Sequence, residues 1–490
     1  MLASMSLAVM LASGAAFVSF GSREASGQTQ ERPNILFIMT DDQPDNTMLA
    51  MPNVRGRVMD MGRRFTNAYV SESLCCPSRA TTFTGQYPHN TRVMRLGPPQ
   101  GGVQTYREMG YEDNNVTQWL GAAGYDTALV GKYMNGYDAS YKPPGWDYWY
   151  AQADGNTPGQ RANNNGRTVD LEGDGKTWTG RLAPKALGYV DRNTDQASDP
   201  PFALFFTPTQ PHLEAGGYAD KYADLYKDEP LDAGPAFNEA DVSDKPRWIR
   251  KLPRITNEQR ETLRLWRQNQ LRSVREVDDA VGKLLGLLAK RGELRNTYVV
   301  YTTDNDTGMG QHRWWDNHGA KETPYQEAAQ VLFFIRGPGI DPGTVDDEHL
   351  ILNNDHAPTM LDMANGTVPA SASVDGRSFL PVAQGNAPAD WRTVVMNERP
   401  VPAGHGIPTY HAVVTQRYTY TEYGTGEEEL YDRKIDPHEM HNLFEPDQPG
   451  LPPPDRTLVE YLKARLADLA SCSGQSCQDA EKVPYSPGAP

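Results

Sequence analysis

Cysteine and basic residues are scarce in this chain. Only four of its 490 residues are cysteines, and 47 lysines and arginines stand against 63 acids, which gives a formal net charge of −16. A protein that binds nucleic acid needs a basic face, so this charge argues against a nucleic-acid partner. An anionic ligand would have to be attracted by a local basic pocket or a metal ion, because the long-range field of the protein is repulsive.

Long apolar runs are also missing, with one exception at the N-terminus. Residues 1–20 carry no charge, and small residues at 25–27 offer a cleavage region. This pattern predicts a secretory signal peptide over 1–28. A membrane anchor is the second interpretation, because the stretch is only just long enough to cross a bilayer. We expect a secreted, periplasmic or otherwise extracytoplasmic protein, lysosomal in a eukaryote, with no membrane association after cleavage.

Two of the four cysteines lie close together near the C-terminus. Cys472 and Cys477 flank a short polar segment, and a small disulfide there fits an exported protein. A zinc site is the alternative, but no second cysteine pair or histidine pair accompanies them. Cys76 is expected to be a small buried apolar residue.

Short apolar runs alternate with helical patterns along most of the chain. The runs cover 35–39, 127–130, 202–206, 298–301 and 331–335. This alternation predicts an α/β fold, with a large mainly parallel sheet sandwiched by helices. The clearest helical pattern covers 258–290, and the stretches 155–180 and 229–246 are predicted to be long surface loops.

The pattern changes after residue 369. Short strands are predicted at 394–398, 412–416, 418–423 and 427–431, followed by a helix over 458–469. We therefore expect a main domain over 30–370, a smaller C-terminal α+β subdomain with an antiparallel sheet over 371–471, and a tail over 472–490 that holds the disulfide loop.

The most informative motif is Cys75-Cys76-Pro77-Ser78-Arg79, followed by Phe83-Thr84-Gly85. Pro77 suits the first turn of a helix, so the side chain at 75 is expected beside free backbone N–H groups and the positive end of the helix dipole. Arg79 lies one turn further on the same face, where its guanidinium can bind an oxyanion. A buried cysteine pair or a redox thiol is the alternative interpretation.

Two pairs of residues with side-chain oxygens, three carboxylates and one amide in all, each follow an apolar run. Asp41 and Asp42 come after the first run, and Asp304 and Asn305 come after the run at 298–301. Such positions lie at the carboxyl edge of a parallel sheet, where open α/β folds bind ligands. Taken singly, each pair is more often a helix cap or a turn. Together their oxygens suit Ca²⁺, with Mg²⁺ as the alternative, and are poor ligands for zinc.

The motif at 75–85 closely resembles that of the sulfatase family, within the alkaline phosphatase superfamily. Further matches follow in the family's order, and the resemblance runs from about residue 33 to 443. It implies an alkaline-phosphatase-like fold and oxidation of Cys75 to formylglycine by a formylglycine-generating enzyme. It also implies a metal site, whose expected ligands are Asp41, Asp42, the modified residue 75, Asp304 and Asn305.

The resemblance also implies roles for residues that are unremarkable in isolation. Lys132 and Lys321 would bind sulfate oxygens together with Arg79, and His212 would protonate the leaving alcohol. Asn135 and His312 are candidate substrate-binding residues. Met134 replaces a histidine found in many members, and Gln326 replaces the usual glutamate. The first of these departures, the double cysteine and the segment 87–90 resemble the N-acetylglucosamine-6-sulfatase branch.

The implied reaction is hydrolysis of a sulfate monoester, in which the hydrated aldehyde attacks sulfur. The expected substrate is a sulfated small molecule or glycan of the N-acetylglucosamine 6-sulfate type. One alternative is a phosphodiester or phosphonate monoester hydrolase of the same superfamily, since a phosphoryl group is similar to sulfate in charge and geometry. Another is a non-catalytic glycan-binding relative in which Cys75 is not modified. The intact set of charged residues argues against that last alternative.

Overall fold

The structure is a computed structural model that describes residues 32–154, 160–195, 200–212, 217–231, 234–315, 321–445 and 454–486. By their internal contacts, residues Arg32–Pro490 form one compact unit. The predicted signal peptide lies outside the described residues, and the predicted boundary at 370/371 stays a prediction. None of the helices in the described ranges has both the length and the apolar content that crossing a bilayer requires.

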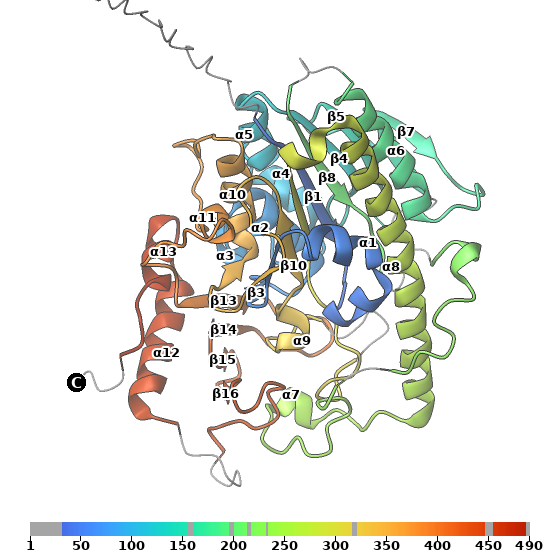
Figure 1. Ribbon diagram of the computed structural model, residues 1–490. Coiled ribbons are helices and arrows are strands. Elements are labelled where there is room, and N and C mark those ends of the chain that lie inside the picture. The colour runs from blue at the N-terminus through green and yellow to red at the C-terminus, as the bar shows by residue number, and fades with distance from the viewer. Residues whose placement is uncertain are drawn as a thin grey trace, which may run out of the picture. The chain divides into compact units, whose positions relative to one another are not determined.

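A ten-stranded sheet forms the centre of the fold (Figure 1). Its order is β11 (Thr344–Asp346), β2 (Arg63–Phe65), β10 (Phe333–Arg336), β9 (Thr297–Thr303), β1 (Asn34–Thr40), β8 (Phe202–Thr207), β4 (Asp126–Lys132), β5 (Tyr148–Gln152), β6 (Arg161–Asn164) and β7 (Arg167–Asp170). The neighbours from β9 to β5 are parallel, as predicted. The apolar run at 331–335 forms β10, which runs antiparallel to β9. The sequence could not show this direction, because an apolar run carries no information on strand direction.

Helices cover both faces of this sheet. Along β1, Leu36 and Ile38 face one core, where they pack with α8 (Asn257–Arg291) and α6 (Trp178–Arg192). Ile35, Phe37 and Met39 face the other core, which contains α2 (Cys75–Thr84), α5 (Val116–Ala122) and α10 (His356–Met363). The two sets of helices lie on opposite sides of the sheet in Figure 1. Strand residues alternate between two buried faces, which confirms the predicted layers.

The stretch 155–180 is not the long loop that the sequence predicts. β6 and β7 form a hairpin joined at Asn165 and Gly166, whose φ angles are 50° and 89°. An Asn-Gly pair with two positive φ angles is typical of a tight hairpin turn. The strands are polar, so the apolar pattern missed them. The described parts of 229–246 contain neither helix nor strand, as predicted.

The C-terminal region contains the predicted antiparallel sheet. Its strands, in order, are β13 (Val394–Arg399), β14 (Tyr410–Thr415), β15 (Tyr418–Tyr423) and β16 (Glu428–Asp432). α12 (Arg456–Leu469) packs on this sheet and shares a core with it. Shorter elements are α1 (Pro52–Val54), α3 (Pro88–Thr91), α4 (Gly102–Glu108), α7 (Arg247–Arg250), α9 (Gln326–Ala329), α11 (Leu380–Ala383), β3 (Ala68–Tyr69) and β12 (Ile351–Leu352).

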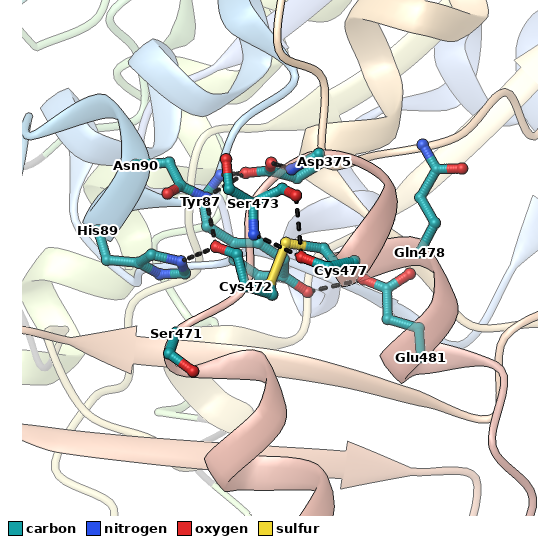
Figure 2. Close-up of a disulfide and its surroundings, with 12 residues drawn as sticks. Tyr87, His89, Asn90, Asp375, Ser471, Cys472, Ser473, Cys477, Gln478 and Glu481 are labelled. Atoms are coloured by element: carbon teal, nitrogen blue, oxygen red, sulfur yellow. Dashed lines mark hydrogen bonds between the residues drawn. A yellow bond between two sulfur atoms is a disulfide. The ribbon is translucent and has the colours of Figure 1, made fainter.

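The tail is more ordered than the sequence predicts. Cys472 and Cys477 form the expected disulfide, and Cys477 lies within α13 (Gln475–Glu481). Figure 2 shows how this loop is held: the carbonyl of Cys472 accepts hydrogen bonds from His89 and Asn90, each at 3.0 Å. The carboxylate of the fully buried Glu481 accepts a hydrogen bond from Tyr87 at 2.8 Å. The tail is thus fixed to the segment that follows α2.

Candidate active site

The charged side chains predicted for the site lie at one edge of the large sheet. β9, β1, β8 and β4 are parallel neighbours, so their carboxyl ends meet at the same edge. Asp41 follows β1 and Asp304 follows β9 at the same level, because the ends of these strands are in register. Lys132 is the last residue of β4, and His212 lies shortly after β8.

Cys75 is the first residue of the buried helix α2, as the position of Pro77 predicts. Its Sγ atom lies 3.5 Å from Oδ1 of Asp41 and 3.8 Å from Oδ1 of Asp42. The ammonium of Lys321 lies 3.3 Å from the same sulfur. The side chain at 75 therefore points into a cluster of charges at the positive end of a helix dipole.

Two buried lysines pair with these carboxylates. Nζ of Lys132 is 2.5 Å from Oδ2 of Asp41, and Nζ of Lys321 is 2.7 Å from Oδ2 of Asp42. Nε2 of His212 is 3.4 Å from the same oxygen of Asp42. The carboxylates are almost fully buried, whereas 15% of the His212 side chain and 8–9% of each lysine side chain is exposed. Solvent therefore reaches the cluster beside its cationic groups.

Close packing of β4 against β8 requires Gly131. Its φ angle is 143°, and a Cβ atom there would lie 2.1 Å from the carbonyl oxygen of Thr207. The hydroxyl of Thr207 donates to the carbonyl of Lys132 at 2.8 Å. A larger residue at 131 would push the end of β4, and with it Lys132, away from Asp41.

Arg79 joins the two acidic strand ends. Its Nε donates to Oδ2 of Asp304 at 2.8 Å, and its Nη1 donates to the carbonyl of Lys132 at 3.1 Å. Its Nη2 lies 3.7 Å from Oδ2 of Asp41 and has no hydrogen-bond partner among the described residues. The guanidinium thus keeps one donor available in the cluster.

The charges around Asp41 decide its protonation. Burial raises the pKa of Asp41, but Lys132, His212 and Arg79 outweigh burial and hold it far below its usual range. Burial and the charge of Asp41 raise the pKa of Asp304 to about 6, although Arg79 opposes this shift. Asp41 is therefore ionised at neutral pH.

Burial and neighbouring charges also shift the pKa values of Lys321, Cys75 and His212. Burial lowers the pKa of Lys321, but Asp42 and Cys75 outweigh it and raise this pKa well above its usual range. Burial raises the pKa of the Cys75 thiol well above its usual range, so an unmodified thiol is neutral at pH 7 and a poor nucleophile. Burial also lowers the pKa of His212.

The donor set fits a hard divalent cation. Four side chains each place a possible ligand atom within 4.8 Å of the others: Asp41, Asp42, Cys75 and His212. Asn305 donates from Nδ2 to Asp42 at 2.6 Å, and its buried Oδ1 has no hydrogen-bond partner among the described residues. Carboxylate and amide oxygens are the ligands that Ca²⁺ and Mg²⁺ prefer. Asp304 is bound to Arg79 instead, so its place in the ligand set stays a prediction.

The two candidate substrate-binding residues are both buried, and the backbone of Asn135 is hydrogen-bonded to the thiol of Cys76, beside Cys75. His312 is 1% exposed, and its Nδ1 lies 2.7 Å from Oε2 of Glu239. Asn135 is 8% exposed, and its carbonyl accepts a hydrogen bond from Val103. Among the described residues, neither side chain forms a hydrogen bond or ion pair with the charged groups around Cys75. Their roles in substrate binding stay predictions.

Several positioning residues were missed by the sequence reasoning. The hydroxyl of Ser78 donates to the carbonyl of Asp304, and the side-chain amide of Asn353 donates to that hydroxyl at 2.9 Å. These bonds tie α2 to the end of β9, next to Asp304. The motif at 75–79 contains Ser78 and could have suggested it, whereas no local pattern marks Asn353.

The segment that carries Lys321 is held from two sides. Nε1 of Trp314 donates to the carbonyl of Lys321 at 3.2 Å. Arg399, at the end of β13, lies 3.2 Å from both Glu322 and Glu72. The C-terminal sheet therefore helps to position a lysine of the site, a contact that no sequence pattern could predict.

Two family models match this chain. The one described as Sulfatase matches residues 33–367, and the one described as N-sulphoglucosamine sulphohydrolase, C-terminal, matches 310–470. An arylsulfatase of Volvox carteri is 30% identical over 94% of this chain and 77% of its own length. N-acetylglucosamine-6-sulfatase of Homo sapiens is 28% identical over 91% of this chain and 86% of its own length.

A solved structure has the same fold. It is a protein in complex with its substrate D-glucosamine-2-N,6-O-disulfate, with a TM-score of 0.73 and 23% identity over 92% of this chain and 99% of that one. The expected fold is thus confirmed. Because the Sulfatase family model covers most of its length and a curated arylsulfatase aligns over nearly all of it, this chain belongs to the sulfatase family.

Proposed function

We propose that this sulfatase cleaves sulfate monoesters of a sulfated sugar or glycan, and that its nucleophile is a formylglycine made from Cys75. The carrying observation is the position of Cys75, whose sulfur lies at a helix N-terminus within 3.5 Å of both Lys321 and Asp41. A substrate of the N-acetylglucosamine 6-sulfate type is supported by the similarity to N-acetylglucosamine-6-sulfatase.

Modification of Cys75 would replace a neutral thiol, which is a poor nucleophile, with a more reactive group. A formylglycine-generating enzyme would catalyse the two-electron oxidation of Cβ of Cys75 to an aldehyde, with molecular oxygen as the oxidant and release of the sulfur as hydrogen sulfide. Hydrated formylglycine supplies two hydroxyl groups on one carbon, one for attack on sulfur and one for release of sulfate.

The cationic residues bind and stabilise the sulfate group. Lys132 and Lys321 carry the most accessible positive charges of the cluster, and Nη2 of Arg79 is a third donor. Donors fixed before the reaction stabilise charge that develops on the transferring group at little cost in reorganisation. The ammonium groups of Lys132 and Lys321 also orient the ester so that its alcohol faces away from residue 75.

His212 is the proposed general acid. Its ring lies 3.4 Å from Asp42 and is the most exposed side chain of the cluster, which suits a group that meets the leaving alcohol. Burial and Lys321 lower its pKa. An anionic ester bound beside Lys321 would offset that repulsion and raise the pKa of His212, which favours its protonated form.

A divalent cation completes the proposed site. Asp41, Asp42, Asp304 and Asn305 would hold it, with Ca²⁺ first and Mg²⁺ second. Such an ion supplies positive charge that polarises a sulfate oxygen and lowers the pKa of a neighbouring hydroxyl. The proposed location is outside the cytoplasm, which is supported by the disulfide between Cys472 and Cys477.

Mass spectrometry of the tryptic peptide 65–79 tests the nucleophile. We expect Cys75 to carry the aldehyde and Cys76 to be unchanged in protein made with a formylglycine-generating enzyme. Hydrolysis of 4-nitrophenyl sulfate should exceed that of 4-nitrophenyl phosphate. The reverse preference would favour a phosphoester hydrolase, and an unmodified Cys75 in active protein would overturn the proposed mechanism.

The adjacent cysteines provide a matched pair of variants. Cys75→Ala should abolish sulfate ester hydrolysis with little effect on folding, because the side chain lies among polar groups. Cys76→Ala should remain active and lose about 1 kcal/mol of stability, because Cys76 is fully buried in the apolar core. Equal loss of activity in both variants would show that helix packing, rather than the nucleophile, had been tested.

A further inference from the structure

A pocket is lined by residues of α7, a helix that lies next to β16 of the C-terminal sheet in Figure 1. Its volume is about 420 Å³, within the range of small-molecule sites. Trp248 and Trp314 line it with ring centroids 5.8 Å apart and planes at 79°. Trp314 is only 6% exposed and packs in a small apolar core, so its ring is rigidly held. Such aromatic faces offer apolar surface to the C–H face of a sugar ring.

The rim of this pocket is basic. Arg247, Lys251 and His405 line it together with one acid, Glu427. Glu427 is already engaged, since Arg250 lies 3.4 Å from it and the backbone N–H of Arg247 donates to it at 2.7 Å. The exposed side chains of Arg247 and Lys251 form no ion pair within the described part of the chain. On a protein with a net charge of −16, this concentration of positive charge favours an anionic ligand.

One residue connects this pocket to the candidate active site. Trp314 donates a hydrogen bond to the carbonyl of Lys321 at 3.2 Å, and the ammonium of the same lysine lies 3.3 Å from the sulfur of Cys75. A single lysine therefore spans the distance between the aromatic pocket and the position of the nucleophile.

We propose that the pocket formed by Trp248, Trp314, Arg247, Lys251 and His405 is a subsite for a second, anionic sugar unit of the glycan substrate. The proposal rests on the proposed function and names the part of the substrate next to the cleaved unit. Trp248, held in place by the buried Trp314, stacks on the pyranose ring, and the basic rim binds its sulfate or carboxylate group. The enzyme then prefers oligosaccharides to monosaccharides.

Kinetics on substrates of two lengths test this subsite. We compare glucosamine 6-sulfate with a heparin-derived tetrasaccharide that carries 6-O-sulfate. Lys251→Ala should lower kcat/KM for the tetrasaccharide about 10-fold, the usual size of one lost contact to a charged group, and leave kcat/KM for the monosaccharide unchanged. Trp248→Phe should act in the same direction. Lys283→Ala removes an exposed lysine on α8 and is the matched control.

Binding to a variant that cannot turn over separates this proposal from the proposed function. Tetrasaccharide is titrated into Cys75→Ala protein and into the Cys75→Ala, Lys251→Ala double variant. About 10-fold weaker binding by the double variant supports the subsite even if no turnover is found. Equal binding by the two proteins, or an equal loss for monosaccharide and tetrasaccharide, overturns it.

Discussion

Lys321 has two opposed effects in this site, and replacing it with methionine separates them. Its ammonium lies 2.7 Å from Oδ2 of Asp42 and 3.3 Å from the sulfur of Cys75. The ammonium of Lys321 would stabilise a sulfate group during transfer. It also pairs with Asp42, and a bound cation would need that carboxylate as a ligand. Lys321→Met keeps much of the side-chain length and removes the charge. We expect slower hydrolysis together with tighter calcium binding.

The expected magnitudes follow from the contacts. Removing one donor aimed at a developing charge costs about 10²–10³ in kcat. Removing a unit charge about 4 Å from another changes their interaction by about 4 kcal/mol at an effective dielectric of 20, so a gain of at least about 10-fold in calcium affinity is expected. In the absence of calcium, Asp42 loses a buried partner, and the free energy of unfolding should fall by up to about 3–5 kcal/mol.

Three measurements check these effects: kcat on 4-nitrophenyl sulfate, calcium affinity by titration, and unfolding with and without calcium. Lys434→Met removes an exposed lysine and serves as the control, with all three values unchanged. Calcium should restore most of the stability of Lys321→Met, because the ion replaces the lost positive charge. If the variant binds calcium more weakly than the native protein, the ammonium does not compete for Asp42 and the argument is refuted.

Two further predictions concern buried carboxylates outside the site. Glu481 accepts hydrogen bonds from Tyr87 and Arg377 at 2.8 Å each, so Glu481→Ala should cost about 3–5 kcal/mol in chemical unfolding. Glu460→Ala, at an exposed ion pair, should cost less than about 1 kcal/mol, and equal losses would contradict the reasoning. Burial raises the pKa of Glu239 from 4.5 to about 8, so its stabilising effect is complete below pH 4.5 and is lost as the pH rises through about 8. Glu239→Gln should reduce the slope of stability against pH in that interval by up to about 1.4 kcal/mol per unit, and parallel curves would contradict this assignment.

The fold was predictable where burial leaves a simple pattern. The central strands are apolar runs because both faces of the sheet are covered, and α8 has a single apolar face with a capping box at Thr256 and Gln259. The β6–β7 hairpin was missed because its strands are polar, although Asn165-Gly166 was a turn signal. α13 was missed because it buries Glu481 through ion pairs rather than through an apolar face.

The site was predictable to the extent that its residues follow strand ends or lie within the cysteine motif. Asp41 and Asp304 each come directly after a buried strand, and the sheet brings them together. The contact between Arg399 and Glu322 depends on where the C-terminal sheet lies against the main sheet. Such a contact between distant segments leaves no local pattern. The pocket lined by Trp248 and Trp314 also brings distant segments together, so no local pattern predicts it.

The charge of the cluster explains how an acidic protein can accept an anionic ester. Three carboxylates and three permanent cations face one another: Asp41, Asp42, Asp304, Arg79, Lys132 and Lys321. These charges nearly cancel, so the protein side chains alone give the ester little net attraction. A divalent ion would make the cluster positive by two charges, and the ester would then be drawn in by the ion as well as held by the lysines. Depletion of the ion should therefore raise KM for a sulfate ester as well as lower kcat.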